Sequence, residues 1–211
     1  MSSKIHQYFI KQFTECWVPD SETEPYLSGK LGHPKSAALQ MKYIDPQSRL
    51  KKQILPKHYA VMIVLSGPEP QRHYLEVELF EAFKHFKGRV LMVKGVIERQ
   101  QTVTQNGPFT IYNFMQTEAL EKAINSSEII VSRSGYTTLM DLAKLNKKAF
   151  FIPTPGQFEQ EYLAERLHEL QIAPYCNQGK FNIELLECLK DYSGFKTPIT
   201  NTDYESLFRL F

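Results

Sequence analysis

Polar residues and glycines gather in three short stretches, each of which follows an apolar run and precedes a helix-like pattern. They read LSGPEPQR at 65–72, SRSGYTTLMD at 132–141 and PTPGQFEQEY at 153–162. The first N–H groups of a helix have no intrahelical partner, and this end of the helix carries partial positive charge. Such turns bind phosphate groups and sugar hydroxyls, so these stretches are the candidate binding turns of the chain.

The stretch at 132–141 has the most informative spacing. We expect Ser134 and Gly135 to end a strand and Tyr136 and Thr137 to begin a helix. Thr138 and Asp141 have the spacing of a capping box, so they can satisfy N–H groups at the helix start. Alternatively, a carboxylate at Asp141 in the first helical turn would accept hydrogen bonds from the two neighbouring hydroxyls of a ribose.

The other two stretches also allow two interpretations. In the first, Gly67 leads into a proline-rich bend, and Ser66 and Arg72 are candidate phosphate contacts. This stretch has neither the G-x-x-x-x-G-K-[ST] of a P-loop nor the G-x-G-x-x-G of a dinucleotide fold, so it is either a plain connection or an atypical phosphate turn.

The third stretch places acidic and amide side chains at the start of a helix. They are Gln157, Glu159, Gln160 and Glu161. Acidic residues there suit the helix dipole without any ligand, but amides and carboxylates together also supply the donors and acceptors that several sugar hydroxyls need. The three turns together favour a ligand with hydroxyls and phosphates, such as a nucleotide sugar.

Alternating apolar runs and helical patterns position these turns. Strands are predicted at 59–67, 89–95, 109–114 and 128–135, followed by a further strand after 145, with helices at 71–86 and 117–125. Because the runs are apolar without alternation, the pattern predicts an α/β fold with a doubly wound parallel sheet covered on both faces. Closing helices are expected at 181–192 and 202–211.

Composition narrows the class of protein. The formal charge of +2 is spread along the chain, so nucleic acid is not an expected partner. Three separated cysteines fit a reducing compartment, and we expect neither a disulfide framework nor a zinc site. No apolar run reaches the length of a membrane span, so we expect a soluble, cytoplasmic protein.

At this point the residues resemble a known family. The segment EIIVSRSGYTTLMDLAKLNKKAFFIPTPGQFEQEYLAERL is similar to the C-terminal, donor-binding domain of glycosyltransferase family 28, the MurG type. LSGPEPQR occupies the place of the first glycine-rich loop of that family. CWVPD, LGHP and MKYIDPQSR resemble the passage between its two domains. The resemblance implies the C-terminal half of the two-Rossmann (GT-B) fold.

The implied domain boundaries follow from that alignment. Residues 1–50 would hold the end of an acceptor domain and the interdomain linker, residues 51–200 the donor-binding domain, and residues 201–211 a closing helix.

The resemblance also implies roles for single residues. Asp141 matches the acidic residue that binds the ribose of UDP, and Gln160 and Glu161 match a Gln-Gln pair that contacts the donor sugar. Ser66 and Arg49 match positions near the diphosphate, with Gly67 in the same loop. The amides near Gly135 match backbone contacts to sugar or phosphate. The corresponding residues of the middle turn are Arg133, Ser134, Gly135, Tyr136 and Thr137.

The family implies metal-independent transfer with a UDP-sugar, UDP-N-acetylhexosamine, as substrate and no further cofactor. Helix-end N–H groups and Arg49 or Arg133 would stabilise the leaving group, although Arg133 also fits a salt-bridged residue at a strand end, which its position favours slightly. The acceptor-binding half is not represented, so the catalytic base is expected there, and activity needs that domain or a partner subunit. This arrangement leaves open peripheral membrane association of the complete enzyme and self-association through the chain ends.

Two other functions remain open. One is a nucleotide-sugar epimerase, although none of the six histidines falls on the three turns. The other is a non-catalytic subunit or docking module of a split transferase. The departures from the family pattern bear on this choice: Asp replaces Glu at 141, Glu replaces Gln at 161, and the first loop has lost its usual glycines.

Overall fold

The computed structural model describes residues 8–9, 12–34, 41–96, 98–196 and 205. The chain divides into two compact units, one of residues 1–47 with 198–211 and one of residues 48–197. The expected closing helix at 202–211 lies, apart from residue 205, outside the described residues.

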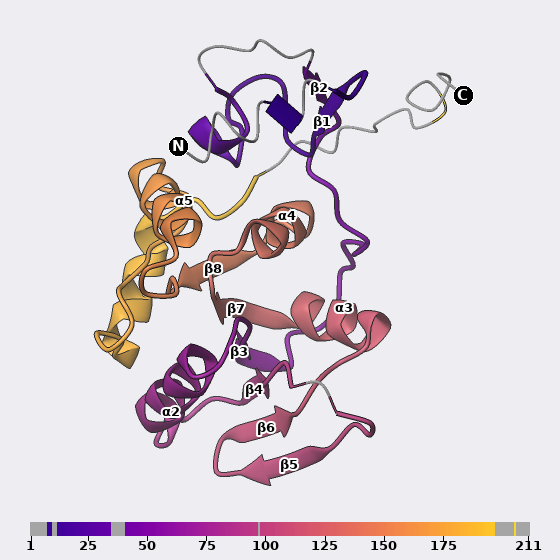
Figure 1. The fold of residues 1–211 in the computed structure, drawn as a ribbon. Coiled ribbons are helices and arrows are strands. Elements are labelled where there is room, and N and C mark those ends of the chain that lie inside the picture. The colour runs from indigo at the N-terminus through magenta and orange to yellow at the C-terminus, as the bar shows by residue number, and fades with distance from the viewer. Residues whose placement is uncertain (1–7, 10–11, 35–40, 97, 197–204, 206–211) are drawn as a thin grey trace. The chain divides into compact units, whose positions relative to one another are not determined.

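The larger unit is built on one mixed sheet with the strand order β5-β6-β4-β3-β7-β8 (Figure 1). In chain order its strands are β3 (Tyr59–Val64), β4 (Val90–Val93), β5 (Val103–Asn106), β6 (Phe109–Tyr112), β7 (Ser127–Ser132) and β8 (Lys148–Phe151). All neighbouring pairs are parallel except β5 with β6. The carboxyl ends of β3, β7 and β8 therefore lie at one edge of the sheet.

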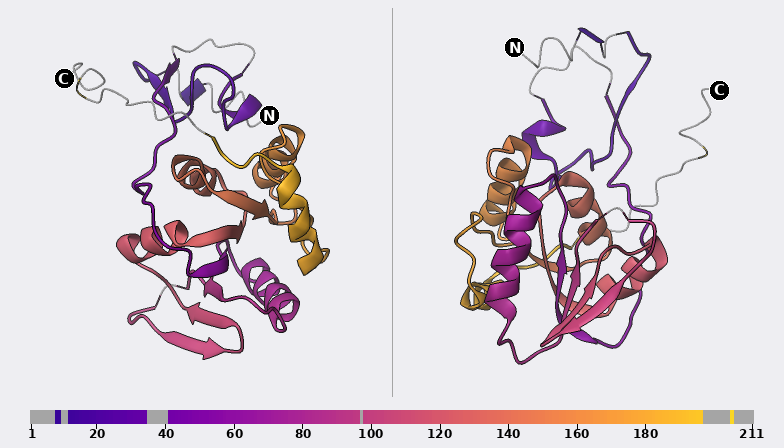
Figure 2. Two further views of the ribbon diagram at one scale, coloured as in Figure 1. Left: turned by 180° about the vertical axis from the view of Figure 1, so that it is seen from behind. Right: turned by 60° about the horizontal axis from the view of Figure 1, so that its bottom comes forward.

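Helices cover both faces of this sheet. They are α2 (Gln71–Phe83), α3 (Thr117–Asn125), α4 (Tyr136–Lys144) and α5 (Phe158–Glu169), with a 3-10 helix η2 (Ile183–Asp191). Figures 1 and 2 show α3 and α4 on one face and α2, α5 and η2 on the other. The predicted doubly wound α/β fold is thus confirmed.

The apolar spacing of α2 shows why the sheet and helices associate. Leu75, Leu79 and Phe83 recur every four residues, so they share one face of the helix. They are buried in one cluster with sheet residues that include Ile63 and Met92. Burying each such side chain contributes roughly 1.5 to 3 kcal/mol, and this cluster anchors α2 on the sheet.

Two details differ from the sequence expectations. Strand β5 was not predicted, because three of its four residues VTQN are polar; in the structure all four are exposed. Asn106 and Gly107 gave a signal for it, since this dipeptide is typical of a hairpin turn, and Gly107 has φ 55°. The segment at 181–192 is helical, but it has 3-10 geometry over Ile183–Asp191.

The smaller unit contains a short parallel pair of strands. Strand β1 (Cys16–Val18) pairs with β2 (Met41–Tyr43), and a 3-10 turn η1 lies at Gly29–Leu31. Asp20 is fully buried and accepts hydrogen bonds from the N–H groups of Leu27 (2.9 Å) and Ser28 (2.7 Å). This carboxylate closes the loop that follows β1.

None of the helices in the described part of the chain is both long and apolar enough to cross a membrane.

Candidate functional site

The three candidate turns follow strands that are neighbours in the sheet. The stretch at 65–72 follows β3, that at 132–141 follows β7, and that at 153–162 follows β8, and these strands have the order β3-β7-β8. In open α/β sheets ligands bind at the carboxyl ends of the strands. The structure therefore brings the three predicted turns to the edge at which a ligand is expected.

The turn after β7 leads directly into α4. Gly135 is the residue before the helix, with φ −68° and ψ 141°, and it has no side chain with which to cap the first turn. A Cβ added at Gly135 would meet no heavy atom of the described residues within 4 Å. Ser134 is buried beneath, and its hydroxyl donates to the carbonyl of Gln160 (2.7 Å). The start of α4 is therefore held by the hydrogen bond of the buried Ser134, and the space in front of Gly135 is open.

The capping-box interpretation of Thr138 and Asp141 is wrong. Because α4 begins at Tyr136, both residues lie inside the helix, and Asp141 belongs to its second turn. The prediction that Asp141 lies in the first turn of the helix is therefore also wrong, because the residue lies one turn further along. Tyr136 and Thr137 begin the helix as predicted, and Thr137 is exposed.

Asp141 is half-buried on α4 and already has a hydrogen-bond donor. The hydroxyl of Ser48 donates to its Oδ1 (2.6 Å), and Ser48 Oγ accepts in turn from the N–H of Leu50 (3.0 Å). Burial raises the pKa of the Asp141 carboxyl above its ordinary value, while Ser48 and the guanidinium of Arg49 act in the opposite direction. The segment at 48–50 thus presents both a hydroxyl and a cation to this carboxylate.

Arg49 also lines a pocket of about 830 Å³ at the end of β6 and the start of α3. The remaining lining residues are Arg99, Gln101, Phe114, Met115, Gln116, Thr117, Glu118 and Ala119. Arg49 and Arg99 are exposed cations, whereas Phe114 and Met115 are half-buried and apolar. The pocket therefore combines apolar surface with positive charge next to a helix start.

Sequence reasoning missed this pocket, although a signal was present. The segment at 113–117 also joins a strand to a helix, in the same way as the three turns that were selected. It carries no glycine or proline, and for that reason it did not stand out.

The turn after β8 is closed by the side chains that the sequence singled out. Gln160 Oε1 accepts from the N–H of Thr154 (2.9 Å), and its Nε2 donates to Gln157 Oε1 (2.6 Å). Glu161 Oε1 accepts from the N–H of Gly156 (2.9 Å). Both side chains thus hold the turn in shape, and their predicted contact with a donor sugar remains a prediction.

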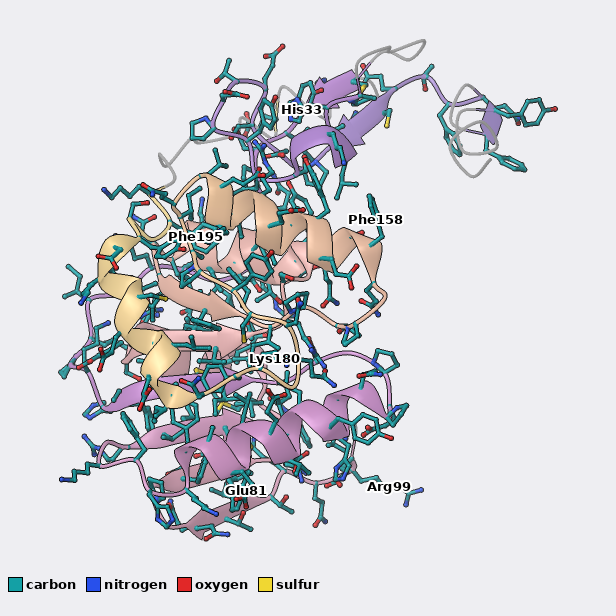
Figure 3. The ribbon with its side chains drawn as sticks, turned by 90° about the vertical axis from the view of Figure 1, so that its left-hand side faces the viewer. His33, Glu81, Arg99, Phe158, Lys180 and Phe195 are labelled. Atoms are coloured by element: carbon teal, nitrogen blue, oxygen red, sulfur yellow. The ribbon has the colours of Figure 1, made fainter. Side chains whose placement is uncertain are left out.

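Exposed groups also mark this end of the domain. Figure 3 shows Phe158 and Arg99 at the end where α2 and α5 begin. The Phe158 side chain is 65% exposed in the first turn of α5.

Arg133 is buried, at 1% exposure, rather than presented to solvent. Its Nη1 donates to the carbonyls of Ile152 (2.9 Å) and Pro153 (3.0 Å). Its Nη2 donates to the carbonyl of Gln71 (2.9 Å) and to Gln178 Oε1 (2.6 Å). Burial lowers its pKa to about 10, so it stays charged at neutral pH. The guanidinium ties the end of β7 to β8 and α2, and its acceptors here are carbonyl and amide oxygens, not the carboxylate of the expected salt bridge.

The turn after β3 supplies its own charges. Ser66 and Gly67 are exposed, and Gly67 has φ +97°, a conformation that favours glycine. Pro70 is the residue before α2, and Glu69 accepts from the N–H of His73 (3.1 Å) in the first turn. Glu69 also pairs with Arg72. The start of α2 is therefore capped by a carboxylate from the chain itself.

Comparison with models of protein families shows to which family the chain belongs. Residues 65–193, more than half of the chain, match the model of the glycosyltransferase family 28 C-terminal domain. The chain belongs to glycosyltransferase family 28. The predicted resemblance is confirmed, and the match begins at the strand end before Ser66 and ends just after η2. No curated protein sequence matches the chain.

Several solved structures are similar to this family 28 domain. The glycosyltransferase of kitacinnamycin has a TM-score of 0.51 at 14% identity, with 77% of this chain and 44% of that chain covered. MurG of Acinetobacter baumannii has a TM-score of 0.49 at 19% identity, with 74% and 48% covered. ALG13 has a TM-score of 0.47 at 16% identity, with 73% and 95% covered.

The shares of the matched chains differ among these structures. The chain spans 36% to 48% of the length of most of them, and 95% of ALG13. The fold predicted for the family 28 segment, the C-terminal half of a two-Rossmann-domain architecture, is confirmed.

Proposed function

We propose that this family 28 domain binds a nucleotide sugar, a UDP-N-acetylhexosamine, and acts as the donor half of a glycosyltransferase. The observation that carries the proposal is the half-buried Asp141 carboxylate, which lies one turn into α4 behind the open space at Gly135. A carboxylate behind a helix start serves a ligand that has hydroxyls next to phosphates. A nucleoside diphosphate has that chemistry.

Asp141 would accept hydrogen bonds from the two ribose hydroxyls. One of its oxygens already accepts from Ser48, and carboxylate oxygens can each accept more than one hydrogen bond. Hydrogen bonds to an ionised acceptor are stronger than those between neutral groups, so the ionised carboxylate would be the binding form.

The base would enter the pocket beside Arg49. This residue lines the pocket and also lies near enough to Asp141 to affect its pKa, so the pocket and the carboxylate can serve neighbouring parts of one ligand. Half-buried Phe114 and Met115 offer apolar surface to a flat ring, and the amide of Gln101 can hydrogen-bond the edge of a base.

The diphosphate would lie at the start of α4, where N–H groups and the helix dipole favour negative charge. In the transfer step the acceptor hydroxyl attacks the anomeric carbon, the bond to the diphosphate breaks, and the nucleoside diphosphate leaves with the bonding electrons. The helix start and Arg49 would stabilise that leaving charge without need of a metal. Arg133 would support the turns without touching the diphosphate, because a direct contact would require its four hydrogen bonds to rearrange.

The remaining parts of the reaction belong to an acceptor domain or partner subunit. We expect the base that takes the proton of the acceptor hydroxyl to lie there. We place the reaction in the cytoplasm, consistent with three separated cysteines.

Calorimetric titration with UDP, UDP-N-acetylglucosamine, GDP and ADP tests the proposal. We expect selective uridine binding that Asp141→Ala weakens by about 1 to 3 kcal/mol, the cost of losing hydrogen bonds to a charged group. Asp141→Asn keeps the shape of the side chain and should weaken binding as well. Asp191→Ala on the exposed end of η2 is the control and should change nothing.

The outcomes separate this function from the alternatives. Failure to bind any nucleotide would contradict the proposal and favour a docking module. Interconversion of sugars by this chain alone would favour an epimerase. Uridine binding that Asp141→Ala and Asp141→Asn leave unchanged would remove Asp141 from the site.

A further inference from the structure

Thr154 has a buried hydroxyl that the rest of the turn does not use. The residue is 3% exposed, and its Oγ1 has no hydrogen-bond partner among the residues that the structure describes. Its backbone is fully engaged, because its N–H donates to Gln160 Oε1 (2.9 Å) and its carbonyl accepts from the N–H of Gln157 (3.1 Å). The side chain alone is left unpaired.

An unpaired buried hydroxyl destabilises the domain, since the group loses its hydrogen bonds to water and gains none. Valine has nearly the same shape and would avoid this cost. Buried polar groups in folded proteins almost always have a partner. A partner supplied by a ligand explains why the site holds a hydroxyl.

The surroundings of Thr154 show where that ligand would be. A Cβ added at Gly67 would lie 3.8 Å from Thr154 Oγ1, so the hydroxyl faces the exposed turn after β3. Gln160 joins the other two turns, because its carbonyl accepts from Ser134 Oγ and its side chain accepts from the N–H of Thr154. The hydroxyl therefore lies where the three turns meet, and Gln160 links Thr154 to Ser134, which precedes the open start of the nine-residue helix α4.

The position of Thr154 indicates which part of a nucleoside diphosphate could contact it. Asp141 and the pocket-lining start of α3 belong to the face of the sheet covered by α3 and α4, whereas Thr154 leads into α5 on the opposite face (Figure 2). A ligand held by its nucleoside at Asp141 would reach Thr154 only with its distal end.

We propose that the Thr154 hydroxyl donates a hydrogen bond to the second phosphate of a nucleoside diphosphate and so makes the site select diphosphates over monophosphates. This inference rests on the proposed function. Phosphate oxygens are strong acceptors, and a hydroxyl donates to them without adding charge. The carboxylates of Glu69 and Glu161 on the flanking turns are already engaged by backbone N–H groups.

Titration of the full chain with UDP and UMP tests the selection. We expect Thr154→Val to weaken UDP binding about tenfold, the loss of one hydrogen bond to a charged acceptor, and to leave UMP binding unchanged. Thr154→Ser keeps the hydroxyl and should restore most of the UDP affinity. Thr104→Val, the same substitution on the exposed strand β5, is the control.

The midpoint of thermal unfolding without ligand separates a binding role of Thr154 from a structural one. If the hydroxyl stabilised the fold, Thr154→Val would lower this midpoint. Thr154→Val removes an unpaired buried hydroxyl, so the midpoint should rise or stay constant while UDP affinity falls. Equal UDP binding by wild type and Thr154→Val would overturn the inference and leave the proposed function intact. Equal losses for UDP and UMP would overturn the selection for the second phosphate. No binding of UDP by the wild type would refute the proposed function itself.

Discussion

The turns after β3 and β7 contain the same dipeptide and yet are built in opposite ways. Ser66-Gly67 and Ser134-Gly135 both lead from neighbouring parallel strands into helices. Ser66 is exposed, and the helix that follows is capped by Glu69. Ser134 is buried, and the helix that follows begins at open space.

The difference lies in what satisfies the start of each helix. At α2 the carboxylate of Glu69 already occupies the helix start, so its negative charge disfavours an anionic ligand there. At α4 the residue before the helix has no side chain, and the supporting contacts come from beneath through Ser134 and Arg133. A Ser-Gly dipeptide therefore marks a binding turn only where the chain leaves the helix start to a ligand.

The two glycines can be separated by substitution, and this gives the largest expected effect. Gly135 has φ −68°, which any residue can adopt, and an added side chain would enter open space. Gly135→Val should therefore lower the free energy of unfolding by no more than about 1 kcal/mol, the preference of a helix start for glycine over valine. It should nevertheless weaken UDP binding at least about tenfold, because the side chain fills the ligand space. Calorimetry and chemical denaturation measure the two quantities.

Gly67→Ala is the matched comparison. Its φ of +97° strains any side chain, so this variant should lose about 1 to 2 kcal/mol of stability. If Gly135→Val instead unfolded the domain, or bound UDP like wild type, the open start of α4 would not be a ligand site.

The pH dependence of binding tests the carboxylate behind α4. Because the pKa of Asp141 is raised by burial, UDP affinity should begin to fall at a pH above that at which an ordinary aspartate protonates. Below that raised pKa the affinity should fall up to about tenfold per pH unit. The same titration on Asp141→Asn measures the pH dependence that comes from the ligand's own phosphates. The difference between the two curves therefore reports the titration of Asp141.

Stability without ligand should show the opposite trend. A raised carboxyl pKa means that the folded state binds the proton more tightly than the unfolded state. The contribution of Asp141 to the free energy of unfolding should therefore fall as pH rises from the ordinary pKa of 3.8 through the raised value. Identical pH profiles for wild type and Asp141→Asn would show that folding does not raise the pKa of this carboxyl.

The fold was predictable because its signals are local and repeated. Runs such as YAVMIV and EIIV are apolar without alternation, and the spacing of Leu75, Leu79 and Phe83 is helical, so each element could be assigned from its own residues. The polar strand β5 lacked such a run. The 3-10 geometry of η2 is a difference of hydrogen bonding that the apolar spacing does not encode.

The candidate site was predictable in its location but not in its contacts. The alternation of strands and helices predicts parallel strands, whose carboxyl ends lie at one edge of the sheet. The strand order β3-β7-β8, which makes the three turns neighbours, is seen only in the structure. Whether a polar residue faces a ligand or the protein depends on contacts across the sequence. Arg133 bonds to Gln178 and Ser48 bonds to Asp141 across 45 and 93 residues, and no local pattern reveals such pairs.

The smallest expected effect comes from the turn that is already closed. Glu69→Gln keeps an acceptor for the N–H of His73 and removes a negative charge from the turn after β3, next to the proposed diphosphate. UDP affinity should rise about two- to threefold at low salt, and the gain should disappear at high salt because exposed charges are screened. Glu81→Gln is the matched control, since Glu81 pairs with Lys84 further along the same helix (Figure 3). A loss of affinity with Glu69→Gln would mean that the self-capped turn also serves the ligand, and the contrast between the two turns would fail.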